Sequence, residues 1–462
     1  MRAPKIPAAG PGRRALLLAS AGLLGGCEWL DDLFRERKVP LAGERRSVLS
    51  AVQRAGLSVD EGLQARAVSL PPPTPNADWP QAGGAPSHAP GHLALDTGAA
   101  GSGGSLREAW RSSFGSGSGY RRRITGAPIV AGGTVYVVDA LGIVSAFDAA
   151  TGARRWRLDS RPEEERDGAV GGGVAFDAGT LYVASGLAEM LAVDPAEGGV
   201  RWRTRLPAPT RGAPTVVNGR IFVPTIENQL LALSAEDGRR LWTHRASPAT
   251  AVPLGLPAPA VEGDTVVAGF ASGELSALRA SDGRVLWTET LAAAGTSTLA
   301  EIAGIRALPV VDHGRVFAVG MGGLSIAIDL RSGRRLWERE VGGTEAPWSA
   351  GEWLFLLSRD GELAAIGGEN GRVRWVTDLQ RPREGRRDPP PAHWAAPVLA
   401  GGRILVAGSG GEMVAVEPTD GRILERRRLP GGVTLQPAVA GGTLYLATDD
   451  ATLVALRGAA SA

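Results

Sequence analysis

The sequence predicts an all-β protein: an eight-bladed β-propeller of four-stranded antiparallel blades, with the last blade closed by an N-terminal strand. Two observations lead to this prediction. A strand-and-turn unit recurs along most of the 462-residue chain, and the units at its two ends are incomplete in complementary ways. Gly (65) and Pro (32) together make up about a fifth of the residues, and hydrophobic residues reach 44%, which suits many tight turns around a large core.

The clearest copy of the unit spans residues 127–156. It reads as an apolar strand, a Gly-Gly turn, an alternating strand, a second Gly turn, a third strand, an Asp…Thr-Gly turn and a strand containing Trp, and therefore as a four-stranded meander. The last turn glycine and the Trp keep one spacing in six copies: Gly152/Trp156, Gly198/Trp202, Gly238/Trp242, Gly283/Trp287, Gly333/Trp337 and Gly371/Trp375. Successive tryptophans lie 38 to 50 residues apart, which is the period of propeller blades.

The remaining units complete the ring. A seventh copy keeps the turn Asp420-Gly421 but has Glu425 where Trp is expected. The C-terminal residues 437–456 supply three strands and then stop, while residues 106–110 form a lone Trp strand with no blade before it. Together these two pieces make an eighth blade, and closing the ring removes the exposed edges of an open array.

The repeated Trp residues are interpreted as scaffold. A large indole can pack between blades while its N–H finds a partner near a turn. The repeated acids, such as Asp148 and Asp329, have a backbone role in their turns, where Asp accepts from nearby amides. The structural tryptophans are Trp110, Trp156, Trp202, Trp242, Trp287, Trp337 and Trp375.

The N-terminus is typical of an exported lipoprotein. Residues 1–26 form a signal peptide with Arg13-Arg14 before an apolar run that is too short to span a bilayer. The run ends in Leu-Gly-Gly before Cys27, which resembles the bacterial lipobox, so Cys27 is the predicted lipidation site. The twin arginines leave both the Sec and the Tat export routes open. Glu28, rather than Asp, follows the Cys and favours the periplasmic face of the outer membrane over retention at the inner membrane.

The rest of the chain divides by composition. Residues 27–75 are charged and Pro-rich and are predicted to be a flexible tether, residues 76–105 are a segment preceding the propeller, and residues 106–458 are the propeller itself. The single Cys permits no intramolecular disulfide, and the five scattered His residues form no metal motif. A net charge of +2 produces no strong positive electrostatic potential that would attract nucleic acid.

The repeat resembles a known one. Residues 146–156 and 327–337 are similar to the tryptophan-docking repeat of quinoprotein dehydrogenases, which also occurs in the family of the outer-membrane assembly factor BamB. The lipobox, the compact body, residues 76–88 and residues 322–337 look like BamB. The dehydrogenase alternative would imply pyrroloquinoline quinone under an adjacent Cys-Cys disulfide, Ca²⁺ ligands and a base Asp, yet the only thiol is Cys27.

The BamB resemblance implies a non-catalytic scaffold with no cofactor and no small-molecule substrate. It would dock on a POTRA domain of the barrel-inserting subunit BamA, beside other members of the BAM complex. The family's contact loops align with residues 250–256 and 295–308, although Gly304 and Arg306 stand where the family has acids. The candidate contact residues are Ala251, Pro253, Leu254, Leu256, Gly304, Ile305 and Arg306. Ordinary inter-blade linkers are the alternative interpretation of these loops.

A third possibility is a periplasmic propeller that binds peptidoglycan or peptides. Trp348, Trp353 and Trp394 lie outside the repeat position and could form an aromatic patch on the rim, since aromatic residues are enriched at binding hot spots. Residues of this kind are more often part of the local core.

Overall fold

A computed structural model describes residues 57–60, 62, 68–96, 105–120, 122–162, 165, 171–291, 304–380 and 392–458. The chain divides into two units, Met1–Gln53 and Arg54–Ala462. The first unit, which holds the predicted signal peptide and the lipidation residue Cys27, lies outside the described residues. All described residues belong to the second unit.

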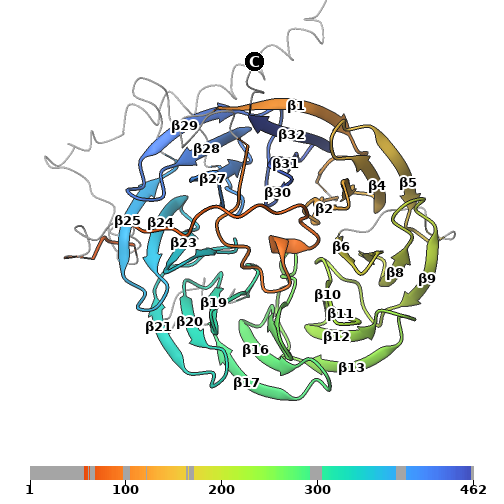
Figure 1. The fold of residues 1–462 in the computed structure, drawn as a ribbon. Helices are drawn as coiled ribbons and strands as arrows, with labels where there is room; N and C mark the ends of the chain where they lie inside the picture. Colours follow the sequence, from red (N-terminus) through yellow and green to blue (C-terminus); the bar gives the residue numbers. More distant parts are fainter. Residues whose placement is uncertain are drawn as a thin grey trace, which may run out of the picture. The chain divides into compact units, whose positions relative to one another are not determined.

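The second unit is an all-β, eight-bladed propeller, as predicted (Figure 1). Each blade is a four-stranded antiparallel sheet, and the described part contains one short 3₁₀ turn, η2 (Ala82–Gly84). The three inner strands of each blade are largely buried, whereas the outer strands of blades 1 to 4, such as β5 and β9, alternate exposed with half-buried residues.

Blades 1 to 4 follow one another along the chain, each running from the channel to the periphery. Blade 1 is β2 (Ile129–Ala131), β3 (Thr134–Val138), β4 (Ile143–Asp148) and β5 (Arg154–Asp159). Blade 2 is β6 (Gly172–Asp177), β7 (Thr180–Ser185), β8 (Glu189–Val193) and β9 (Val200–Arg205). Blade 3 is β10 (Thr215–Val217), β11 (Arg220–Thr225), β12 (Gln229–Ser234) and β13 (Arg240–Arg245). Blade 4 is β14 (Ala260–Glu262), β15 (Thr265–Gly269), β16 (Glu274–Arg279) and β17 (Val285–Thr290).

Blades 5 to 8 complete the circle. Blade 5 is β18 (Val310–Asp312), β19 (Arg315–Val319), β20 (Ser325–Asp329) and β21 (Arg335–Arg339). Blade 6 is β22 (Trp348–Ala350), β23 (Trp353–Leu357), β24 (Glu362–Gly367) and β25 (Val373–Asp378). Blade 7 is β26 (Val398–Ala400), β27 (Arg403–Gly408), β28 (Glu412–Val416) and β29 (Ile423–Arg428). Blade 8 is β30 (Ala438–Ala440), β31 (Thr443–Ala447), β32 (Thr452–Gly458) and β1 (Leu106–Ser113).

Blade 8 is shared between the two ends of the propeller, which confirms the predicted closure. Strand β1 pairs antiparallel with β32, from Leu106 opposite Gly458 to Ser113 opposite Thr452. The register shifts between Glu108 and Trp110, as it does at the corresponding point of the outer strand of blade 1. The N-terminal strand therefore occupies the same position as the outer strand of a continuous blade.

Each repeat Trp is held between two blades. In six blades its ring lies 5.8–6.2 Å, centroid to centroid, from a Tyr or Phe on a middle strand of its own blade. Its far side meets the turn glycine of the next blade. A Cβ on Gly152 would lie 2.5 Å from the ring of Trp110, so only glycine fits there, and its φ of +73° also favours glycine.

The indole N–H completes the contact by donating to the next blade. Nε1 of Trp375 donates to the Pro418 carbonyl at 2.9 Å. Equivalent bonds run from Trp110, Trp156, Trp242, Trp287 and Trp337 to Ala149, Pro195, Ala280, Leu330 and Gly368, respectively. Packing and a satisfied N–H at one site explain why Trp and Gly recur together.

The seam between blades 7 and 8 lacks this arrangement. Glu425 occupies the Trp position, opposite Ala415, and Leu405 stands where six other blades have an aromatic residue. Blade 8 also has no turn between its two outer strands, because β32 and β1 come from opposite ends of the propeller. A tryptophan at position 425 would therefore have no turn glycine to pack against.

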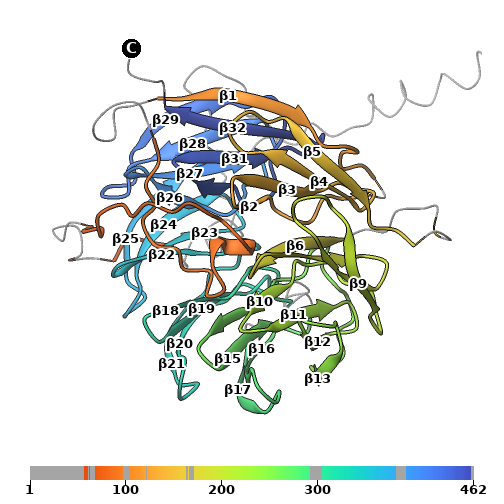
Figure 2. The same ribbon diagram turned by 45° about the vertical axis from the view of Figure 1, so that its right-hand side comes forward.

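Residues 74–96, here called the inner strap, cross the middle of the ring (Figures 1 and 2). The strap makes hydrogen bonds to the inner strand of every blade, in blade order. The partners in blades 1 to 8 are Val130, Phe176, Val216, Val261, Val311, Trp348, Leu399 and Val439. The side chain of Gln81 both donates to and accepts from the Val216 backbone at 2.8 Å.

The two ends of the strap meet at the seam that lacks a tryptophan, where Thr74 N donates to His92 O and Ala94 N donates to Thr74 O, both at 2.8 Å. On blade 7, Leu93 N donates to Leu399 O, and Gly401 N donates to Leu93 O. On blade 8, Asp96 N donates to Gly442 O at 3.0 Å. The strap is also packed across the channel, because the Trp79 ring stacks on Trp348 at 6.2 Å with an interplanar angle of 12°.

Part of the predicted tether is bound to the propeller. Leu57 is buried in a cluster that includes Trp337. Asp60 N donates to Val373 O at 3.0 Å, and its carboxylate accepts from Val373 N and forms an ion pair with Arg339 at 2.6 Å. Residues 57–60 thus lie along the start of β25, so free movement is not a property of the whole 27–75 segment.

Replacing Trp375 with Ala is expected to lower the free energy of unfolding by about 3–5 kcal/mol, because the ring is 5% exposed and its loss leaves a cavity between two blades. Chemical denaturation measures the change. The matched control is Glu425→Gln at the same register position, where the side chain is 38% exposed and lies 3.9 Å from Arg403, and we expect a smaller loss because no cavity is left. Equal losses for the two variants would contradict the assigned role of the tryptophan.

The strap should make stability pH-dependent through His88. Its Nδ1 lies 2.7 Å from Pro309 O, and burial lowers the pKa of His88 from 6.5 to about 4. Between these values the unfolded chain binds a proton that the folded chain does not, so stability falls as the pH drops. The His88 contribution should be roughly 2 kcal/mol smaller at pH 5 than at pH 7. The stability of a His88→Gln variant should fall less steeply than that of the original protein as the pH drops from 7 to 5. Identical profiles of unfolding free energy against pH would rule the His88 contribution out.

Candidate partner-docking site

The two loops predicted to contact a partner flank blade 4. Residues 250–256 lead from β13 toward β14, and residues 304–308 lead into β18. Of the second predicted loop, 295–308, only residues 304–308 are described. Both loops therefore emerge on the same rim of the ring, although about fifty residues separate them in the sequence.

The loops are in contact. Nε of Arg306 donates to the Leu254 carbonyl at 3.4 Å. A Cβ added to Gly304 would lie 3.5 Å from Pro253 Cγ. The two loops therefore form one surface, in which the guanidinium group of Arg306 contacts the backbone of residues 250–256.

The seven candidate contact residues differ in exposure. Leu254 is 55% exposed and Ala251 is also exposed. Pro253 and Arg306 are half-buried, whereas Leu256 and Gly304 are buried. The surface that a partner could reach is therefore centred on Leu254, an apolar side chain.

Ile305 is a correction to the sequence-based set. Its side chain is fully buried and belongs to the core cluster beneath blades 4 and 5, together with Leu275 and Val316. It packs against Gly269, where a Cβ would lie 2.6 Å from Ile305 Cγ2. Ile305 anchors its loop to the propeller and has no surface to offer a partner.

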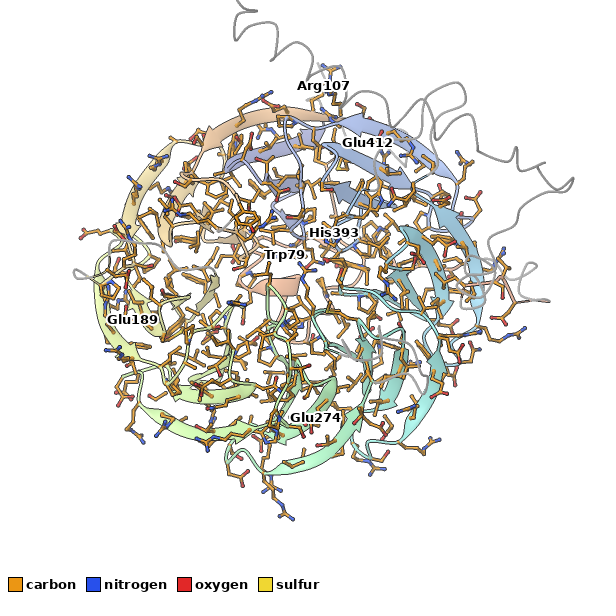
Figure 3. The ribbon with its side chains drawn as sticks, turned by 180° about the vertical axis from the view of Figure 1, so that it is seen from behind. Trp79, Arg107, Glu189, Glu274, His393 and Glu412 are labelled. Carbon is orange, nitrogen blue, oxygen red and sulfur yellow. The ribbon has the colours of Figure 1, made fainter. Side chains whose placement is uncertain are left out.

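Arg306 is engaged within the chain as well. Its guanidinium group forms an ion pair with Glu345 and donates to the Thr344 carbonyl at 3.2 Å. Nε2 of His393 lies 3.2 Å from the same Glu345 carboxylate. Arg306, Glu345 and His393 come from the loops that lead into blades 5, 6 and 7, and His393 lies close to the middle of the ring (Figure 3).

The carboxylate at the centre of this triad is buried. Burial acts to raise the pKa of Glu345, but Arg306 and His393 outweigh it, so the pKa lies below the ordinary value for Glu. Glu345 therefore stays ionised and holds three loops together. Sequence reasoning missed Glu345 and His393. The available signal was the Ala-Pro pair that precedes most inner strands. In blade 6 this pair is Ala346-Pro347, and the acidic residue Glu345 stands directly before it.

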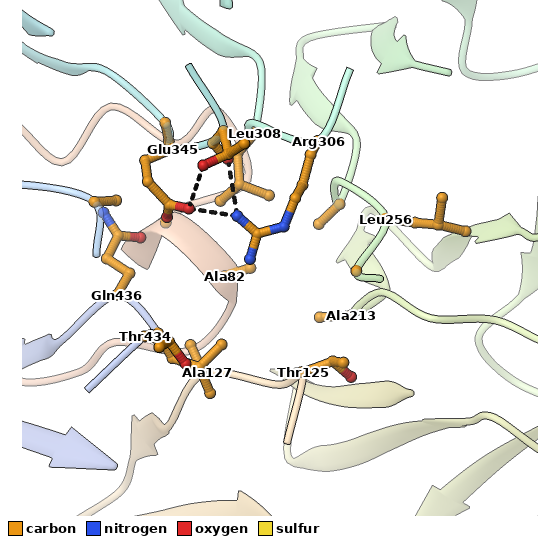
Figure 4. Close-up of a pocket in the computed structure, with 17 residues that line it drawn as sticks. Ala82, Thr125, Ala127, Ala213, Leu256, Arg306, Leu308, Glu345, Thr434 and Gln436 are labelled. Carbon is orange, nitrogen blue, oxygen red and sulfur yellow. Dashed lines mark hydrogen bonds and ion pairs between the residues drawn. The ribbon is translucent and has the colours of Figure 1, made fainter. Parts of the chain in front are cut away.

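The triad lies beside a small cavity at the mouth of the channel (Figure 4). Ala82 and Gly83 of the inner strap contribute to its lining, and its volume is about 100 Å³. Ligand pockets usually span about 300–1,000 Å³, so this space suits a side chain better than a large cofactor. Small residues from several blades surround it: Ala127, Ala213, Ala258, Ala346 and Ala396.

Other candidate side chains have structural surroundings. Trp348, Trp353 and Trp394 are only 2%, 4% and 5% exposed, so they are local core and form no aromatic patch on the rim. The repeated acids bind their own turns. Hydrogen bonds from Arg155 and Thr151 lower the pKa of Asp148 to about 2.

Within the described residues, no group of three or more His, Cys, Asp or Glu side chains is arranged to hold a metal ion. None of the helices in that part of the chain combines the length and apolar character needed to cross a bilayer.

Two family models match the chain. One, described as outer membrane protein assembly factor BamB, covers residues 140–377 and 359–460. The other, the β-propeller domain of glucose/ethanol/alcohol dehydrogenase, covers residues 79–179. The first spans most of the propeller and the second is confined to its N-terminal part.

Curated relatives agree with the first model. The chain is 27% identical to outer membrane protein assembly factor BamB of Yersinia pestis over 355 residues, covering 75% of this chain and 87% of that protein. It is 27% identical to BamB of Escherichia coli strain K12 over 392 residues, covering 75% and 88%. These matches extend over nearly the whole length of each relative.

Solved structures share the fold. The crystal structure of BamB from Moraxella catarrhalis has a TM-score of 0.65 at 19% identity and covers 76% of this chain and 99% of that one. A europium-containing methanol dehydrogenase has a TM-score of 0.64 at 14% identity, covering 80% and 89%. Fold similarity alone therefore does not separate assembly factors from dehydrogenases.

Proposed function

The chain belongs to the family of outer membrane protein assembly factor BamB, and from this premise we propose that it is a non-catalytic scaffold of the β-barrel assembly machinery. In this proposal it docks on the POTRA region of BamA, beside other members of the complex, and aids the insertion of outer-membrane proteins. The observation that carries the proposal is the surface made by residues 250–256 and 304–308, which presents Leu254 on a rigid ring.

Leu254 is proposed as the apolar anchor of the docking surface. An exposed apolar side chain on a well-supported loop can fill a pocket of a partner and supply much of the binding energy. The loop is supported from below by Arg306, whose charge is already paired with Glu345. Arg306 is therefore assigned a positioning role. It stands where the family has an acid, but its positive charge is paired with Glu345, so the charge presented to a partner is not reversed.

A quinone-dependent dehydrogenase is the competing function, because the fold and residues 79–179 also resemble that class. Three observations favour the scaffold. The single Cys of the sequence leaves no adjacent pair of thiols, the cavity at the mouth is small, and Arg306 and Glu345 neutralise each other beside it.

The proposed location is the periplasmic face of the outer membrane, with acyl chains on Cys27 as the anchor. More than one chain is needed for stable anchoring, which the lipobox pattern before Cys27 would provide. The 29 residues that lie between Cys27 and the docked Leu57 would have a reach of about 30 Å if flexible. The propeller would then work close to the membrane without being fixed against it.

Replacing Leu254 with Asp is expected to weaken capture of BamA from solubilised envelope by about tenfold or more, because it puts a charge where an apolar contact is proposed. The measurement is a quantitative pull-down with the full-length protein as bait. Leu241→Asp is the matched control, since Leu241 is an apolar side chain that is 37% exposed but belongs to β13 and to neither loop.

Two further results would bear on the scaffold. A Cys27→Ala variant should fold and capture BamA normally but leave the membrane fraction. If the unmodified protein captures no BamA, and instead binds pyrroloquinoline quinone tightly and reduces a dye acceptor, the scaffold function is wrong.

A further inference from the structure

The outer strands of the eight blades are sheet edges, and seven of them carry arginine. Arginine occurs in β1, β5, β9, β13, β21, β25 and β29. Charged side chains on an edge discourage pairing with another chain. Strand β17, with the sequence Val-Leu-Trp-Thr-Glu-Thr, has neither Arg nor Lys.

Strand β17 also exposes apolar side chains. Val285 is 45% exposed and the adjacent Leu286 is 42% exposed. The one charged residue of the strand, Glu289, is paired with Arg335 of blade 5 at 2.6 Å. The strand is the last in the order of its sheet, so its outer backbone groups have no neighbouring strand in the described residues.

A second outer strand with little charge, β25, has another segment of the chain bound along it. Strand β25 has a single Arg and is the other edge with little charge. There the chain's own residues 57–60 lie along the strand, and Asp60 both donates to Val373 O and accepts from Val373 N. No equivalent segment covers β17 in the described part of the chain.

The position of β17 connects it with the proposed docking surface. It is the outer edge of blade 4, the blade flanked by residues 250–256 and 304–308. A partner held on those loops would therefore lie beside this edge.

We propose that the edge of β17 binds an extended strand of an unfolded outer-membrane barrel protein and adds it to blade 4 as a fifth strand. Barrel strands alternate apolar and polar residues over about ten positions. Recognition through backbone hydrogen bonds tolerates many sequences, and Val285 and Leu286 can contact the apolar side chains. The identity of this ligand rests on the proposed function, whereas the unpaired edge rests on the geometry of the described residues alone.

The direct test is binding of a fluorescent peptide of about ten residues with alternating apolar and polar side chains, the length of a membrane barrel strand. Full-length protein in detergent is titrated against the peptide and anisotropy is recorded. Leu286→Arg, which restores the charge found on the other edges, should weaken binding about tenfold or more. Leu241→Arg, at the equivalent bulge of β13, should leave it unchanged.

Backbone recognition gives a second readout. A peptide N-methylated at alternate residues along one edge should lose binding, and a peptide methylated along the other edge should keep it. Equal binding by the two methylated peptides, or equal effects of Leu286→Arg and Leu241→Arg, would overturn the proposal. So would a dimer of the full-length protein that Leu286→Arg dissociates, because a second copy would then occupy the edge.

Capture of BamA separates this proposal from the scaffold function. Leu286→Arg should retain BamA and lose only the peptide. Loss of the peptide site with BamA retained supports the edge, while failure of the unmodified protein to capture BamA would count against the scaffold whatever the peptide does.

Discussion

Closure of the ring is the constraint on which the rest of this structure depends. Eight blades must be held in a circle although the chain begins and ends inside one of them. Between most blades the contact is a tryptophan seated on a turn glycine, as Trp375 sits on Gly421. Between blades 7 and 8 that contact is missing, and the two ends of the inner strap come together there, where Ala94 N donates to Thr74 O.

The strap also determines what the channel can do. By bonding to the inner strand of every blade, it occupies the part of the ring where a fold of this kind has room for a ligand. The small cavity at the mouth of the channel remains, and Arg306, Glu345 and His393 join three loops beside it. A closed and rigid ring that displays loops is suited to holding other proteins in position, which is why the scaffold function fits the geometry.

The sequence predicted those features that repeat. The Gly–Trp spacing marks six blades, and the two incomplete ends predict the shared blade, because a strand lacking neighbours must find them elsewhere. The strap could not be predicted in this way. Residues 74–96 have no periodic pattern, and their partners, backbone groups in every blade except the Trp348 indole of blade 6, are spread over eight blades.

Individual side chains in the loops were harder to assign for a similar reason. Ile305 stands in a loop that aligns with a contact segment, yet it is buried against Gly269. Glu345 and His393 are 48 residues apart in the sequence and meet only because their blades are close in the ring. Burial and pairing depend on tertiary neighbours that the local sequence does not specify.

The claim that the inner strap completes the ring is tested most directly by removing it and returning it as a separate peptide. The protein lacking residues 74–96 should unfold at a lower denaturant concentration, and a peptide of residues 74–96 should restore the midpoint in proportion to its concentration. A peptide carrying Gly84→Ala should restore less than one carrying Gly91→Ala. A Cβ at Gly84 would lie 2.7 Å from the Trp79 ring, whereas at Gly91 it would meet nothing within 4 Å. An unchanged midpoint after deletion would contradict the account.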